Sequence, residues 1–107
     1  MRIIVSGMLL DACVLGALSV TPTYGYDLTQ RIKNTIYVSE STLYPVLRKL
    51  LKEDMLEIFD EPFDGRNRRY YKITAKGTQA LSTYIDNWEE QQKNINILLT
   101  GGLYEKE

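Results

Sequence analysis

The chain has no histidine and a single cysteine among its 107 residues. Histidine is the commonest general base and metal ligand in proteins, and one cysteine forms neither an internal disulfide nor a zinc site of several thiolates. The glycine-rich patterns of nucleotide-binding loops are also missing. We therefore predict a protein that is not an enzyme and holds no metal ion or cofactor. Cys13 lies in an apolar run, which favours a buried thiol over a redox switch.

The chain also has little net charge, with a formal value of -1. The composition as a whole therefore gives no sign of a polyanionic partner. The basic residues are nevertheless unevenly placed: ten of the thirteen Lys and Arg lie between positions 31 and 76, and acids exceed bases elsewhere. With 44% hydrophobic and 25% charged residues, we expect one small globular domain that has a locally basic face and gains stability from dimerisation.

One apolar run, from Ile3 to Val20, could be a signal peptide or a membrane anchor. Asp11 stands in its middle, where a charge costs about 2.5 to 3.5 kcal/mol in a membrane, and Arg2 is the only basic residue before it. The run therefore predicts a buried helix that contacts its own domain and a dimer partner, because it is apolar nearly all round. We expect a cytoplasmic protein without a membrane segment, with export or anchoring as the rival.

Two helices joined by a turn are predicted next. Thr23 is a favourable N-cap for a helix from about Tyr24 to Thr35. The following helix begins either near Ser41 or at a Ser39 cap with a bent first turn, because Pro45 fits poorly beyond a helix start. Its apolar residues recur at steps of three and four and form a core side: Leu43, Val46, Leu47, Leu50 and Leu51. The opposite side carries hydroxyls, then positive charge: Ser41, Thr42, Pro45, Arg48, Lys49 and Lys52, with Tyr44 at its flank.

A hairpin with a basic returning strand follows. The residues from Met55 to Asp60 and from Asn67 to Ile73 predict two strands, and Pro62 together with Asp64-Gly65 predicts the turn. Four basic residues on the tip and the second strand have no acidic neighbour in the sequence: Arg66, Arg68, Arg69 and Lys72. The preceding helix face alone would suit solvent or a polyanion equally, but a basic hairpin directly after it favours nucleic-acid binding.

These motifs resemble the signature of the PadR-type winged helix-turn-helix transcriptional regulators. The matching segments are STLYPVLRKL at 41–50 and GRNRRYYKIT at 65–74, with Gly77 and Tyr24-Gly25. The resemblance implies an α+β, mostly helical fold, with a winged helix-turn-helix domain at 1–74 and a dimerisation helix with a short tail at 75–107. It also implies a homodimeric repressor on an inverted-repeat operator in double-stranded promoter DNA. The alternative is a winged-helix protein-interaction module. The expected DNA contacts are Tyr24, Ser39, Ser41, Thr42, Tyr44, Arg48, Lys49, Arg66, Arg68 and Arg69, although tyrosines at the second helix are also typical packing residues.

A long final helix is predicted from about Ala75 to Leu99, capped by Thr74. Leu81, Trp88 and Ile95 are seven residues apart, which predicts a dimer seam between two such helices. Gln91 and Gln92 interrupt the seam or line a cavity. Trp88 is typical of a packed dimer core. The chain also resembles short PadR-type regulators that have a tryptophan at this place and look like multidrug sensors. That resemblance implies a planar aromatic effector, with a binding site formed by Trp88, Gln92, Val5, Met8 and Ala12.

Overall fold

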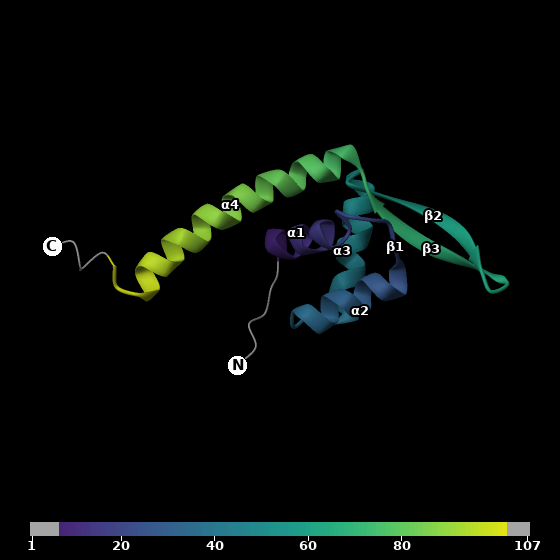
Figure 1. The fold of residues 1–107 in the computed structure, drawn as a ribbon, viewed down its shortest axis with the longest axis horizontal. Helices are drawn as coiled ribbons and strands as arrows, with labels where there is room; N and C mark the ends of the chain where they lie inside the picture. Colours follow the sequence, from purple (N-terminus) through teal and green to yellow (C-terminus); the bar gives the residue numbers. More distant parts are fainter. Residues whose placement is uncertain (1–6, 103–107) are drawn as a thin grey trace.

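The computed structural model describes residues 7–102, which form four helices and a small antiparallel sheet (Figure 1). The elements are α1 (Gly7–Ala17), β1 (Thr23–Tyr24), α2 (Gly25–Thr35), α3 (Glu40–Lys52), β2 (Leu56–Phe63), β3 (Arg66–Ile73) and α4 (Ala75–Leu99). The predicted α+β, mostly helical class is confirmed. The helix predicted at 3–20 ends earlier than expected, at Ala17, and positions 3–6 lie outside the described residues.

The core lies where α1, α2 and α3 meet the base of the sheet. Its buried side chains are Leu10, Val14, Leu15, Leu18, Leu28, Ile32, Leu43, Leu47, Leu50 and Leu56. The four-residue steps in α2 and the three- and four-residue steps in α3 bring these leucines and isoleucines to one side of each helix. Leu81 and Tyr84 of α4 pack against this core from outside. The predicted core side of α3 is therefore confirmed: Leu43, Leu47 and Leu50 are buried, and Val46 and Leu51 are partly buried against the same core.

The long helix α4 makes the molecule elongated, with extents of 67 × 31 × 21 Å and a radius of gyration of 16.8 Å. A compact domain of this size would have a radius of about 13 Å. Figure 1 shows the C-terminal half of α4 extending away from the other elements. Its apolar side chains are consequently exposed: Ile85 46%, Trp88 42%, Ile95 41%, Leu98 69% and Leu99 77%. Within residues 7–102, no helix is both long enough and apolar enough to cross a membrane.

The sheet has the strand order β1-β3-β2, and its hairpin turns on two residues, Asp64 and Gly65. Both have positive φ, 53° and 79°, as the tight turns that match strand twist require. The prediction that Pro62 belongs to the turn is wrong, since Pro62 pairs with Asn67 inside β2. A proline is tolerated there because β2 is an edge strand and the missing N–H takes nothing from a neighbour.

The short strand β1 was not predicted. Thr23 pairs with Tyr71 and Tyr24 with Tyr70, so the backbone before α2 is held by the sheet. The residue at the N-cap of α2 is Tyr24, which makes no side-chain cap bond, and the prediction of Thr23 as N-cap is wrong. A β-carbon on Gly25, the first residue of α2, would lie 3.1 Å from the Tyr71 ring. Glycine therefore lets the helix start directly against β3.

A rigid joint connects the hairpin to α4. Only Thr74 separates β3 from α4, and its hydroxyl accepts from the Gly77 N–H at 3.0 Å, which confirms the predicted cap. The same hydroxyl donates to the Asp54 carbonyl at 2.7 Å, and Lys76 Nζ donates to the Glu53 carbonyl at 2.8 Å. These bonds join the start of α4 to the loop that leaves α3.

Candidate nucleic-acid interface

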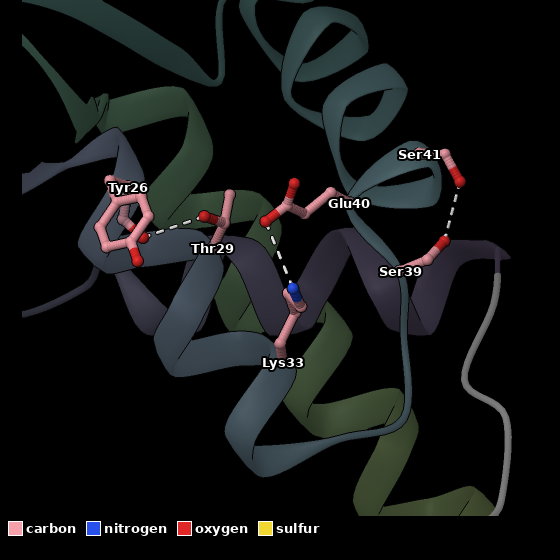
Figure 2. A network of polar contacts seen from close by, with 6 residues as sticks. All are labelled: Tyr26, Thr29, Lys33, Ser39, Glu40 and Ser41. Carbon is pink, nitrogen blue, oxygen red and sulfur yellow. Dashed lines mark hydrogen bonds and ion pairs between the residues drawn. The ribbon is translucent and has the colours of Figure 1, made fainter.

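Three exposed hydroxyls gather at the start of α3. The Ser39 hydroxyl lies 2.9 Å from that of Ser41 and 3.1 Å from that of Thr42, and Figure 2 shows the first of these contacts. The helix begins at Glu40 and contains Pro45. Since proline has no N–H, the Ser41 carbonyl lacks its usual partner four residues on. The first turn of α3 thus presents hydroxyls and a carbonyl to solvent, a set that can both donate and accept.

An ion pair fixes α2 against the start of α3. Lys33 Nζ lies 3.2 Å from Glu40 Oε1 (Figure 2). Glu40 is the first residue of α3, where a carboxylate also interacts favourably with the positive end of the helix dipole. Arg31 donates to the Ala17 carbonyl at 3.3 Å. These two cations of α2 therefore already have partners within the chain. The same figure shows the Thr29 hydroxyl donating to the Tyr26 carbonyl at 2.9 Å inside α2.

The two faces of the hairpin carry different side chains. Successive strand residues point to opposite faces, and Tyr71 and Ile73 pack against the core, so Arg69 shares their face. Burial raises the pKa of Tyr71, while the charges of Arg69 and Arg48 act in the opposite direction. Arg48 of α3 and Arg69 of β3 are therefore both close enough to Tyr71 to influence its titration. Helix α3 and the inner face of the hairpin converge at this point.

Arg68 belongs to the opposite, outer face. Its guanidinium lies 3.7 Å from the centre of the Phe63 ring and 4.4 Å from that of Tyr24. Tyr70, on the same face, stacks on Phe59 at 5.4 Å with 11° between the ring planes, and lies 6.0 Å from Tyr24. Arg68 is thus held between two aromatic rings and links the hairpin to β1. Sequence reasoning grouped Arg68 with Arg69, but the structure separates them.

Acidic residues on β2 oppose the basic residues of β3. Arg69 lies 3.7 Å from Asp60 and Lys72 lies 3.9 Å from Glu57, each pair directly cross-strand. Positions 56–73 hold four acidic and four basic residues, so the hairpin has no formal net charge. Exposed pairs of this kind contribute about 0 to 1 kcal/mol and can exchange for another anion. Arg48 and Arg66 have no ion-pair partner among residues 7–102.

Lys49 is tied to the first helix. Its ammonium forms an ion pair with Asp11 of α1, whose side chain is 5% exposed. The hydrogen bond to Asp11 is the main cause that raises the pKa of Lys49. Lys49 was predicted to lie with Arg48 on the DNA-facing side of α3. Its side chain is 48% exposed, but its ammonium is engaged by Asp11 of the first helix. The partner lies 38 residues away in sequence, so no local pattern could indicate it.

The predicted effector residues lie on two helices that pack together. Trp88 and Gln92 are exposed on α4. On α1, Met8 is 63% exposed and Ala12 is half-buried. Val5 lies outside the described residues.

Comparison with known proteins identifies one family and several similar proteins. Residues 14–83 match the model of the transcriptional regulator PadR-like family. Uncharacterized protein X of Lysinibacillus sphaericus is 32% identical over 97 residues, which cover 86% of this chain and 89% of that protein. Transcriptional regulator Rv3488 of Mycobacterium tuberculosis is 36% identical over 73 residues, covering 67% and 68%. The crystal structure of smu.1704 from Streptococcus mutans UA159 superposes with a TM-score of 0.86 at 35% identity, covering 94% and 95%.

Proposed function

This chain belongs to the PadR-like family of transcriptional regulators, which are not enzymes, and we propose that it represses transcription by binding an inverted-repeat operator in double-stranded promoter DNA as a homodimer. In this proposal residues 1–74 bind DNA, with the N-terminal helix also in dimer contact, and residues 75–107 form the dimer. The observation that carries it is the packing of Tyr71 and Ile73 of the hairpin against the core that buries the leucines of α3. A helix for the major groove and a strand for the flanking backbone are thereby presented together.

The DNA contacts are assigned by what each side chain already does in the chain. Arg48, Arg66 and Arg69 would bind phosphates, since the first two have no ionic partner among the described residues and the third has only an exposed one. The hydroxyls of Ser39, Ser41 and Thr42, together with exposed Tyr44, would meet base edges or the groove wall. Lys49, Arg68 and Tyr24 are assigned to support, because Asp11 and the aromatic cluster engage them.

The homodimer is supported by the exposed side of α4. Helix α4 is 25 residues long, and its apolar residues recur at seven-residue steps. Most of this apolar stripe is left exposed by the rest of the chain, so a second molecule is needed to cover it. Pairing of two such helices would bury this surface. It would also present two copies of α3, which in dimers of this geometry bind successive major grooves about 34 to 36 Å apart.

An effector site between the two copies is the finer part of the proposal. Trp88 is 42% exposed on α4, so its ring is available to stack on a planar aromatic molecule, with Gln92 one turn further and Met8 and Ala12 on the adjacent α1. Because Trp88 is the only tryptophan, its fluorescence reports this site alone. Quenching by planar aromatic dyes is expected, and a broad panel without any effect would leave Trp88 as a dimer-core residue.

The DNA proposal is tested by a salt titration on the promoter region upstream of the protein's own coding sequence. Each phosphate contact contributes about 0.9 to the slope of log K against log salt concentration. Arg48→Gln should therefore flatten the slope by about 1.8 for a dimer. Lys93→Gln is the matched control, because Lys93 is exposed outside the proposed DNA contacts and lies on the side of α4 away from Trp88 and Ile95. A protein whose binding disappears at physiological salt, or is competed equally by unrelated DNA, would instead fit a protein-interaction module.

A further inference from the structure

Asp11 is the only charged residue that is buried within the described part of the chain, with 3% of its surface exposed. It stands in the middle of an otherwise apolar helix, between Leu10 and Ala12. A buried carboxylate is costly unless a cation or hydrogen-bond donors compensate it. That cation is Lys49, which comes from α3.

Three helices meet at this pair. Lys49 lies between Arg48, which points to solvent, and Leu50, which is fully buried. Its ammonium binds Asp11 of α1 and also lies within electrostatic range of Tyr84 on α4. Helices α1 and α4 are themselves in contact, since Gly16 approaches the Leu81 side chain. The pair therefore links the proposed DNA-reading helix to both helices of the proposed dimer region.

Neither a phosphate contact nor simple stability accounts for this pair. To reach DNA, Lys49 would have to leave Asp11 unpaired, and an unpaired buried carboxylate is strongly destabilising. Stability alone does not require it, because replacing ion pairs that involve a buried charge by apolar side chains of similar volume is often neutral or stabilising. The buried leucines of α3 fix which side of the helix faces the core, and the pair adds a second attachment, from an exposed position of α3 to α1, that limits rotation of α3 about its own axis.

We propose that the Asp11–Lys49 pair is a positioning device that sets the rotation of α3 against α1, so that Arg48 and the hydroxyls of Ser41 and Thr42 face DNA together. This inference rests on the proposed DNA binding. Lys49 then acts through α3, and its loss changes which DNA is preferred without removing a phosphate contact.

The test compares three variants with the parent protein. Lys49→Met leaves the carboxylate unpaired and should lower the melting temperature. The double variant Asp11→Leu with Lys49→Met removes both charges at similar volume and should melt at or above the parent. Lys49→Arg keeps the pair. Binding is measured across a salt series on the promoter fragment and on scrambled DNA of equal length.

The double variant should bind scrambled DNA with the parental affinity and salt slope, but its preference for the promoter fragment should fall at least tenfold. Lys49→Arg should keep most of that preference. Full preference in the double variant would reduce the pair to a stability element and overturn the proposal. A slope lowered by about 1.8 would place Lys49 on phosphates and overturn it as well. If the parent itself shows no preference, the proposed function fails first and the positioning role falls with it.

Discussion

Arg68 and Arg69 are sequence neighbours whose replacement by glutamine should have different effects. Each substitution removes one positive charge from the same strand, so each controls for the other. Arg69 shares the inner face with Tyr71, where α3 converges. A phosphate contact by Arg69 in both copies of a dimer implies that Arg69→Gln flattens the salt slope by about 1.8. Between 50 and 200 mM salt, the variant should therefore lose roughly tenfold less affinity than the parent.

Arg68→Gln should leave that slope unchanged and weaken the fold instead. Its guanidinium covers the rings of Phe63 and Tyr24, and each such contact at an exposed site is worth about 0.5 to 1 kcal/mol. The expected loss in free energy of unfolding is about 1 to 2 kcal/mol, a fall of roughly 5 °C or more in melting temperature. Binding is followed by fluorescence anisotropy and melting at matched protein concentration. If Arg68→Gln flattened the slope as much as Arg69→Gln, the assignment of the two arginines to different faces would be wrong.

Other predictions address the joint, the dimer and the titrating groups. Gly77→Ala should lower the free energy of unfolding by about 1 to 3 kcal/mol despite the better helix propensity of alanine, because the new β-carbon would clash with the Met55 carbonyl oxygen. Gly16→Ala should not be destabilised, because its new β-carbon would lie 3.8 Å from the Leu81 side chain, an ordinary van der Waals contact. If the proposed homodimer forms along α4, Ile95→Glu should convert it to monomer in sedimentation at micromolar concentration, and a dimer that is unchanged by this substitution would exclude α4 as the seam. Burial raises the pKa of Cys13, so its alkylation near pH 8 should be slower than in the unfolded chain. Because the pKa of Cys13 is higher in the folded chain, the contribution of this thiol to stability is fully present below its ordinary pKa of 9.0. That contribution is lost as pH rises from 9.0 through the folded pKa.

Local rules were sufficient for most of the helical fold. The apolar spacing in α3 predicts its buried side, because side chains three and four residues apart share one face. Thr74 and the residues after it predict the start of α4, since a hydroxyl at an N-cap satisfies a free N–H of the first turn. Both signals act within a few residues, and so they can be read from the chain directly.

The turn residues of the hairpin contain enough information to predict its cross-strand charge pairs. A two-residue turn at Asp64-Gly65 pairs residue 63 with 66, and this register sets Asp60 opposite Arg69 and Glu57 opposite Lys72. The alternation of side chains along a strand puts Arg68 and Arg69 on opposite faces. The neutral hairpin and its divided arginines could therefore have been predicted. The Asp11–Lys49 pair could not, because it depends on how two helices pack after the chain has folded.

Two joints connect α4 and its neighbour α1 to the elements proposed to bind DNA. One is the bonded junction at Thr74, where a single residue separates β3 from α4. The other is the Asp11–Lys49 pair at α3. If two copies pair along α4, a change in the angle between the two long helices must carry α3 and the hairpin with it as one body. An effector at Trp88 would then control the separation of the two DNA-binding heads rather than the shape of either, and it would do so only by binding one separation more tightly than another.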